Sequence, residues 1–155
     1  MPRNHRSPCG TRLGLPVAQL VATELDRIVV RRRAEQEVVN EPGGWQRSIL
    51  SPVVPGVNFE WIRTTLPPGC DAGVFFAYAS GSHEFLAVVE GGLRLTIDTT
   101  TVDLKAGDSV YFAADATHCY ENPTRQPCTY FVAALTMRPR GAGRSSRRVT
   151  GAPQD

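Results

Sequence analysis

A glutamate and a histidine in this sequence could do chemistry, and each has a fixed spacing to a glycine. Six residues separate Glu84 from Gly91. His118 comes eleven positions after Gly107 and four before Asn122. An imidazole beside a carboxylate can transfer protons near neutral pH, and both groups are metal ligands. If the two share a pocket, they could carry out acid–base chemistry, help to bind a metal, or orient a small polar ligand.

No second carboxylate or nucleophile suggests itself as the partner that would complete a catalytic site. Cys119 adjoins His118, but neighbours on a strand point to opposite faces of a sheet, which argues against a Cys–His nucleophile pair. The four cysteines show no CxxC spacing, so we expect free thiols in a reducing compartment. We therefore name no catalytic residue, and we favour a binding protein over an enzyme without deciding between them.

Short β-strands joined by turns are predicted to position these residues. The chain has 14 glycines and 12 prolines among its 155 residues, which favours many tight turns. Gly91-Gly92 predicts a hairpin between two alternating segments. The expected strands are 28–33, 48–50, 57–66, 74–79, 85–90, 93–98, 101–104, 109–112, 117–121 and 129–137. Their number and spacing indicate one all-β domain, a sandwich or a barrel.

Strand alternation groups the side chains of the expected pocket. If Glu84 faces inward, so does Leu86, and if His118 faces inward, so does Tyr120. Such a cavity would be mostly apolar with a few polar groups, as small-molecule sites usually are. The predicted ligand-binding pocket consists of Phe76, Tyr78, Ser80, His83, Glu84, Leu86, His118 and Tyr120. For Phe76 and Leu86, a place in the barrel core is an equally good interpretation.

One segment departs from the strand pattern. Pro16 suits a first helical turn, and apolar residues between positions 17 and 25 recur at helical spacing. We therefore predict a short helix over 13–26. The remaining domain organisation is a disordered segment over 1–12, a β-barrel over 27–137 and a disordered, arginine-rich tail over 138–155.

Charge is distributed unevenly along the chain. Residues 1–39 carry seven arginines and four acids, residues 40–137 five basic and ten acidic residues, and residues 138–155 five arginines and one acid. The central part would repel nucleic acid, and the tail is better explained as a solvated segment than as a phosphate-binding one. No apolar run approaches the roughly 20 residues of a membrane span, and no secretory signal is present. A cytoplasmic location is therefore expected.

The spacing around Glu84 and His118 resembles the two motifs of the cupin superfamily, G-x5-H-x-H-x3,4-E-x6-G and G-x5-P-x-G-x2-H-x3-N. Glu84 and Gly91 match the end of the first motif. The second motif is matched by Gly107, His118 and Asn122, with Ala113 and Asp115 in place of its proline and inner glycine. The resemblance covers residues 57–137. It implies an all-β, single-domain cupin jelly-roll barrel, to which the sequence adds a short N-terminal helix.

The resemblance also implies what the site lacks. Metal-binding cupins hold iron, manganese or nickel with three histidines and one glutamate. Here the places of the first two histidines hold Ala77 and Ala79, or Tyr78 and Ser80. His118 and Glu84 thus form an incomplete metal site, and His83 could join them only if a turn at 80–82 rotated it inward. We expect no cofactor, with a divalent Fe, Mn or Ni ion as the less favoured alternative.

A finer resemblance concerns bacterial transcription regulators that join a helix-turn-helix domain of the xenobiotic-response type to a C-terminal cupin sensor. The segments that carry it, in order, are 13–20, 28–32, 50–52, 65–69 and 107–112. It implies a small-molecule-binding sensor domain, with the helix at 13–26 as a remnant of the helix-turn-helix domain. Nucleic acid would then be bound only through a missing or partner helix-turn-helix domain. The alternatives are a metal-dependent dioxygenase or isomerase and a non-catalytic module that forms a homodimer; no membrane partner is expected.

Overall fold

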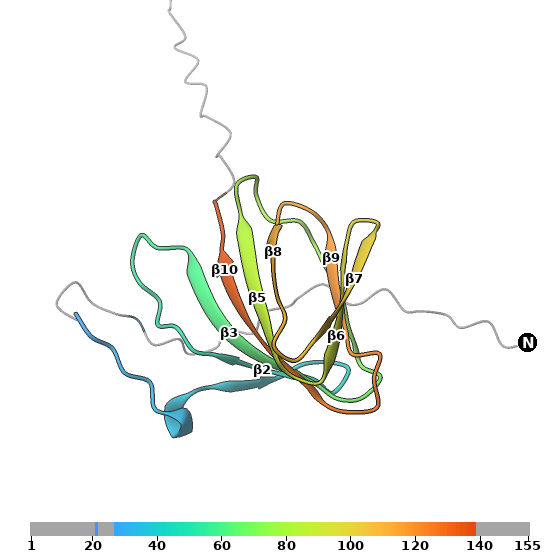
Figure 1. Ribbon diagram of the computed structural model, residues 1–155. Helices are drawn as coiled ribbons and strands as arrows, with labels where there is room; N and C mark the ends of the chain where they lie inside the picture. Colours follow the sequence, from blue (N-terminus) through green and yellow to red (C-terminus); the bar gives the residue numbers. More distant parts are fainter. Residues whose placement is uncertain (1–20, 22–26, 139–155) are drawn as a thin grey trace, which may run out of the picture.

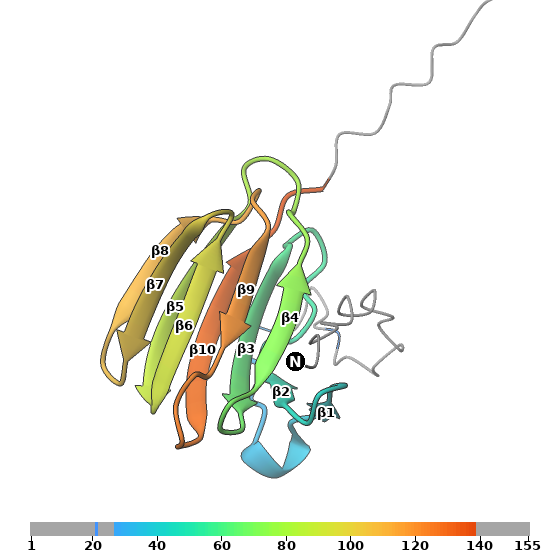
Figure 2. The ribbon, with the colours of Figure 1, turned by 90° about the vertical axis from the view of Figure 1, so that its right-hand side faces the viewer.

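The computed structural model describes Val21 and residues 27–138, which form two β-sheets facing each other (Figure 1). The six-stranded sheet has the order β1 (Val38–Asn40), β2 (Gln46–Ile49), β3 (Phe59–Leu66), β10 (Cys128–Leu135), β5 (His83–Glu90) and β8 (Ser109–Ala113). The four-stranded sheet has the order β4 (Asp71–Phe75), β9 (His118–Glu121), β6 (Gly92–Ile97) and β7 (Thr100–Lys105). In Figure 2 the four-stranded sheet lies in front of the larger one. This is the predicted all-β jelly-roll barrel.

Alternating burial along the strands explains why the two sheets pack together. On β10 every second residue from Cys128 to Ala134 is buried, and β5 and β3 show the same period. Burying one face of each sheet removes apolar surface from water, at roughly 25 cal/mol per Å². The core between the sheets therefore includes Leu66, Leu93 and Leu95, which are almost completely inaccessible.

The predicted hairpin at Gly91-Gly92 is wrong, because its two arms lie in different sheets. β5 pairs with β10 and β8, whereas β6 pairs with β7 and β9. Gly91 instead makes a tight corner, with a φ of 74° and no room for a side chain. A Cβ at this position would lie 2.2 Å from the carbonyl oxygen of Pro127. The glycine is therefore required by this corner and by the close approach of the chain leading into β10.

Two further strand predictions need correction. Residues 28–33 form no strand, and a short 3₁₀ helix, η1 (Arg33–Glu35), follows there. Arg31 instead donates from Nη1 to the carbonyl oxygen of Ile49, at 3.0 Å. The strand expected at 74–79 begins earlier, at Asp71, and ends at Phe75. Asp71 accepts a hydrogen bond from the backbone N–H of Gly73, and the pairing of β4 with β9 shifts register between Asp71 and Val74. Strand β1 was not predicted.

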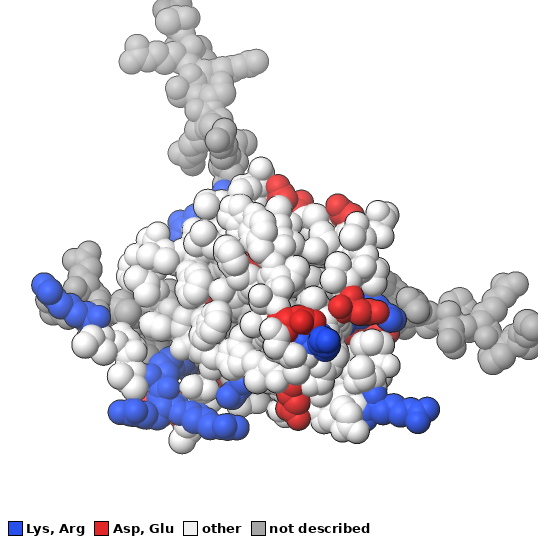
Figure 3. Space-filling view, viewed as in Figure 1, with Lys and Arg blue, Asp and Glu red and all other residues white. Residues whose placement is uncertain are grey.

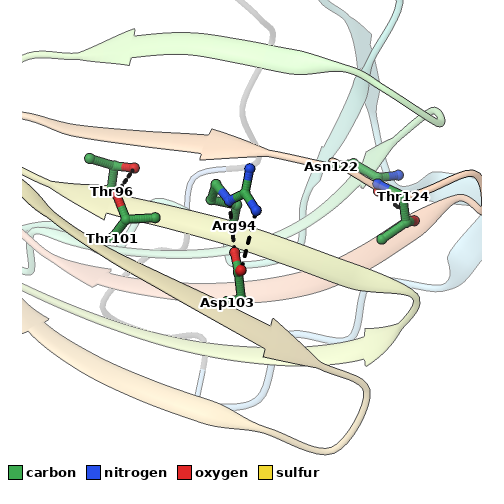
Figure 4. A network of polar contacts seen from close by, with 6 residues as sticks. All are labelled: Arg94, Thr96, Thr101, Asp103, Asn122 and Thr124. Atoms are coloured by element: carbon green, nitrogen blue, oxygen red, sulfur yellow. Dashed lines mark hydrogen bonds and ion pairs between the residues drawn. The ribbon is translucent and has the colours of Figure 1, made fainter.

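Asn122, the last residue of the second motif, holds the loop between β9 and β10. Its Nδ2 donates to the carbonyl oxygens of Leu66, Pro67 and Gln126, and its Oδ1 accepts from the backbone N–H and hydroxyl of Thr124 (Figure 4). The side chain is completely buried. A buried amide with all its donors and acceptors paired stabilises one loop conformation. Asn122 therefore has a structural role in this loop.

Several predictions concern segments outside the described residues. These are the disordered segment 1–12, the tail 138–155 beyond Arg138, and the helix over 13–26 apart from Val21, which makes an isolated parallel bridge to Val53. In the part of the chain that the structure describes, no helix is long and apolar enough to cross a bilayer. The described surface seen in Figure 3 is mostly uncharged, with basic and acidic side chains scattered at its margins and centre.

Candidate functional site

The inner faces of β5 and β9 bring the two motif residues together. Glu84 on β5 is 3% exposed and His118 on β9 is 1% exposed, although both carry polar side chains. Leu86 and Tyr120, two residues further along each strand, are also buried. Strand alternation therefore predicted the inward direction of all four side chains.

Glu84, Tyr120 and His118 form a buried polar cluster. The hydroxyl of Tyr120 donates a hydrogen bond to Oε2 of Glu84, and Nε2 of His118 lies 3.8 Å from Oε1. His118 Nδ1 is 2.9 Å from the carbonyl oxygen of Ala116, which can only accept, so Nδ1 carries a proton. Nε2 has no hydrogen-bond partner among the described residues. The nitrogen of His118 that faces Glu84 is therefore the one without a hydrogen-bond partner in the described structure.

Aromatic rings enclose this cluster and exclude water from it. The imidazole of His118 stacks on Phe75 with ring centroids 5.6 Å apart, and Phe112, Tyr120 and Tyr78 lie at 5.3, 5.6 and 5.9 Å. Burial and the nearby Glu84 carboxylate raise the pKa of Tyr120 well above its usual value. Tyr120 therefore stays neutral and remains a hydrogen-bond donor to Glu84 at physiological pH.

A cavity of about 40 Å³ lies next to this cluster, between the two sheets. Its polar walls come from Arg47, Thr64 and Glu84 and from the phenols of Tyr78, Tyr120 and Tyr130. The apolar lining is completed by Trp45, Ile62, Phe75, Val132 and Ala134. A space of this size holds about three water molecules. Without a change in its walls, it can take a small polar group but not a whole ligand of drug size.

The structure sorts the eight predicted pocket residues into three groups. Tyr78, Glu84 and Tyr120 line the cavity. Leu86 and His118 are buried without forming its wall. Phe76, Ser80 and His83 lie outside the described cavity.

Two local features explain the residues that lie outside the cavity. Because β4 ends at Phe75, Phe76 and Ser80 fall in the following loop, and Phe76 is 72% exposed. His83 alternates with Glu84, and its Nδ1 lies 2.8 Å from the hydroxyl of Tyr111 on the outer face. Cys119, next to His118, is only half-buried and by the same alternation faces away from the cluster.

The pocket predicted from the sequence did not include several residues that line the cavity. Arg47 lies on β2 opposite Thr64, but the strand predicted from the sequence began at residue 48 and did not include it. Thr64 and Tyr130 alternate with exposed or half-buried neighbours on β3 and β10, so strand alternation could have placed them inside. Trp45 precedes β2 and packs near Phe75, with ring centroids 6.3 Å apart. Nothing local to Trp45 predicts this contact across the two sheets.

The donors at the site do not fit the usual requirements of a divalent transition metal. Such an ion takes at least three good ligands, with imidazole favoured. Here only His118 Nε2 and Glu84 Oε1 approach each other, and His83 faces the opposite side of the sheet. Within the described residues, no group of three His, Cys, Asp or Glu side chains could hold a metal ion. The cluster is better suited to hydrogen bonding than to metal coordination.

The fold and the two motif residues define a small jelly-roll barrel with a polar cluster inside. Residues 62–134 match the model of the Cupin domain family. Together with the fold, this match identifies residues 62–134 as a cupin domain. No curated protein matches the chain.

Solved structures with the same fold include regulators and a predicted enzyme. The Cupin_2 domain of an XRE family transcriptional regulator from Enterobacter cloacae is 24% identical with a TM-score of 0.56, over 61% of this chain and 98% of that chain. An HTH_3 family transcriptional regulator from Vibrio cholerae is 21% identical with a TM-score of 0.55, over 61% of this chain and 52% of that one. A predicted oxalate decarboxylase from Thermotoga maritima is 19% identical with a TM-score of 0.54, over 70% of this chain and 100% of that chain. At these identities, the likeness shows the fold alone.

Proposed function

We propose that this cupin domain binds a small molecule in its barrel and serves as the sensor part of a bacterial, cytoplasmic transcription regulator. The observation that carries the proposal is the cavity between the sheets, where Glu84, Tyr78 and Tyr120 meet. Aromatic walls with a few convergent polar groups are the usual lining of small-molecule sites. Ligand binding would favour one conformation of the barrel and so bias an attached or partner helix-turn-helix domain.

The regulator role is further supported by the similarity to regulator structures. The Vibrio cholerae protein is an HTH_3 family regulator of which this chain spans about half. Translation of the DNA upstream of the Met1 codon tests whether a DNA-binding domain is encoded in frame. We expect a helical segment with a turn; a sequence without one would contradict the full-length-regulator version of the proposal.

A thermal-shift screen with paired variants tests ligand binding in the barrel. We expect hits that stabilise the wild type and lose their effect in Tyr78→Phe or His118→Ala. Tyr78→Phe removes one hydroxyl from the cavity wall without changing the ring, so it should not unfold the barrel. The matched control is Phe76→Ala, which changes an exposed residue close to Tyr78 in the sequence. This variant should keep the thermal shift that each hit produces in the wild type. If neither inner variant alters the binding of any hit, the pocket assignment is wrong.

A metal-dependent dioxygenase or isomerase is the alternative that metal analysis decides. We propose that the domain works without a bound metal, because two facing donors are too few for a typical site. Purified wild-type protein should then contain iron, manganese and nickel well below one equivalent. One equivalent of any of these metals, lost in His118→Ala, would contradict the proposal and favour the enzyme.

A second candidate function, homodimerisation, is favoured by the outer face of the six-stranded sheet. Trp61 stacks on Phe131 with centroids 5.6 Å apart, and Phe85 packs against Tyr111 at 5.1 Å. Phe85 remains 52% exposed and Tyr111 53% exposed. A continuous exposed apolar surface of this kind is typical of a protein interface. We propose that a second copy of the chain covers it.

Sedimentation of the full chain tests the dimer. Phe85→Ser should shift the protein towards the monomer at a concentration where the wild type is dimeric. Val74→Ser changes an equally exposed apolar residue on the other sheet and should leave the mass unchanged. A monomeric wild type, or a dimer equally sensitive to both changes, would overturn this second function.

A further inference from the structure

The cavity wall contains a buried arginine that neither motif includes. Arg47 on β2 lies directly opposite Thr64 on β3, and both line the cavity. The Arg47 side chain is only 10% exposed. A guanidinium stays charged even when it is buried, and a buried charge needs partners to offset its desolvation.

Glu41 supplies only part of that partnership. Arg47 donates from Nε to Oε1 of Glu41, which lies between β1 and β2. Among the described residues, no hydrogen-bond partner is found for the two terminal nitrogens of Arg47, Nη1 and Nη2, and neither belongs to the fully buried unpaired atoms. These nitrogens carry the remaining N–H donors of the guanidinium. Glu41 therefore offsets the charge of Arg47 at Nε, while the N–H donors of Nη1 and Nη2 are available to a ligand.

We infer that the cavity takes the carboxylate group of a small organic acid, bound through Nη1 and Nη2 of Arg47. The inference rests on the proposed ligand-binding function and names the class of ligand. The planar guanidinium matches a carboxylate with two parallel, charge-assisted hydrogen bonds. The cavity of about 40 Å³ holds about three waters, which suits an acetate-sized group. The rest of a longer acid would lie outside the cavity.

A second charged group in the cavity wall, Glu84, sets the orientation of the acid. Glu84 accepts a hydrogen bond from Tyr120 and lies 3.8 Å from His118 Nε2. Its carboxylate would repel a second carboxylate placed beside it. The acid group is therefore bound near Arg47, and any hydrogen-bond donor of the ligand faces Glu84.

Glu41 is a positioning residue in this arrangement. It holds the guanidinium through Nε, but its own negative charge opposes a second carboxylate near Arg47. Glu41→Gln keeps an oxygen acceptor for Nε and removes that charge. We therefore expect Glu41→Gln to bind a carboxylate more tightly than the wild type does.

NMR titration of the full chain with propionate, at constant ionic strength, tests the inference. Propionamide has nearly the same shape without the charge and is the control ligand. We expect propionate to bind in the millimolar range and propionamide at least tenfold more weakly, since charge-assisted hydrogen bonds are about twice as strong as neutral ones. Arg47→Gln should abolish the preference. Arg63→Gln is the matched control, because Arg63 lies on β3 beside Thr64 and donates to Ser48 outside the cavity.

Three results would overturn the inference. They are equal binding of acid and amide, an effect of Arg63→Gln as large as that of Arg47→Gln, and weaker propionate binding in Glu41→Gln. The last of these keeps the inference testable if Arg47→Gln fails to fold. Neutral ligands that bind in a Tyr78-dependent manner while propionate does not would overturn the carboxylate class and leave the proposed function standing.

Discussion

The two faces of the six-stranded sheet are both aromatic, but they differ in what surrounds the rings. On the inner face, Tyr130 stacks on Tyr120 of the facing four-stranded sheet, with ring centroids 5.4 Å apart, in the buried core beside the Glu84 carboxylate. On the outer face, Phe85 and Tyr111 pack at 5.1 Å and remain half-exposed. The inner rings enclose polar groups in a cavity, whereas the outer rings form an open apolar surface. The same residue types thus suit ligand binding on one face and protein contact on the other.

Strand β5 shows the difference within neighbouring residues. Glu84 and Leu86 face the core, while His83 and Phe85 face outward. His83 pairs with the exposed Tyr111, but His118 is held among four rings with Nε2 directed at Glu84. Alternation along one strand therefore separates two surfaces with different chemistry. Substitutions of neighbouring residues on β5 can be used to distinguish them.

The largest expected difference is in stability. Leu86→Ala should lower the free energy of unfolding by about 2–5 kcal/mol, because it leaves a cavity in a packed core. Phe85→Ala should lower it by about 1 kcal/mol or less, because much of the ring is already in water. Urea denaturation of the two variants, at one low protein concentration, measures both values. Equal losses would contradict the distinction between the two faces.

Removal of the buried Tyr120 hydroxyl should have the next largest effect. Tyr120→Phe removes the hydroxyl that donates to Oε2 of Glu84, and loss of one partner of a buried hydrogen bond costs about 1–3 kcal/mol. Tyr111→Phe removes the matching hydroxyl on the outer face, where water can replace it, and serves as the control. Denaturation at pH 7 compares them. If Tyr111→Phe lowered the free energy of unfolding as much as Tyr120→Phe does, the buried hydrogen bond would contribute no more to stability than the exposed one.

Alkaline pH should destabilise the inner face. Burial raises the pKa of both Tyr120 and Tyr130 well above 10.0, so the folded phenols keep their protons when the unfolded ones ionise. Their contribution is fully present below about pH 10 and is lost as the pH rises further, by about 1.4 kcal/mol per tyrosine and pH unit. Burial also raises the pKa of Cys128 from 9.0 to about 11, which adds a loss that begins near pH 9.

Urea denaturation from pH 8 to pH 11 measures that loss. Tyr120→Phe has one buried phenol fewer, so its stability should fall less steeply above pH 10 than that of the wild type. Parallel curves for the two proteins would contradict the role assigned to Tyr120.

The smallest effect is expected for an exposed ion pair. Arg94 on β6 contacts both carboxylate oxygens of Asp103 on β7, at 2.8 and 3.2 Å (Figure 4). The Asp103 hydrogen bond raises the pKa of Arg94, and the same bond lowers the pKa of Asp103. Solvent screening makes such surface pairs weak, so Asp103→Asn should leave the denaturation midpoint unchanged. A clear drop would show that surface polar contacts rival the buried cluster.

The sequence predicted the parts of this arrangement that depend on local periodicity. Inward directions for Glu84, Leu86, His118 and Tyr120 followed from strand alternation, and the buried side chains agree. Tertiary contacts decided the rest. The corner between the sheets requires glycine at position 91, because the chain at Pro127 leaves no room for a side chain there. Strand β4 ends at Phe75, earlier than its sequence pattern predicts. Arg47 reaches the cavity only because β2 pairs with β3, which no local pattern reveals.

The claim that the inner face binds small molecules is tested most directly by amide NMR on the full-length chain. The titrants are propionate and the strongest hit of the thermal-shift screen. We predict that the largest shifts cluster at the cavity, around Tyr78, Glu84 and Tyr120. Shifts that instead concentrate on the outer face, around Trp61, Phe85 and Tyr111, would contradict a ligand site inside the barrel.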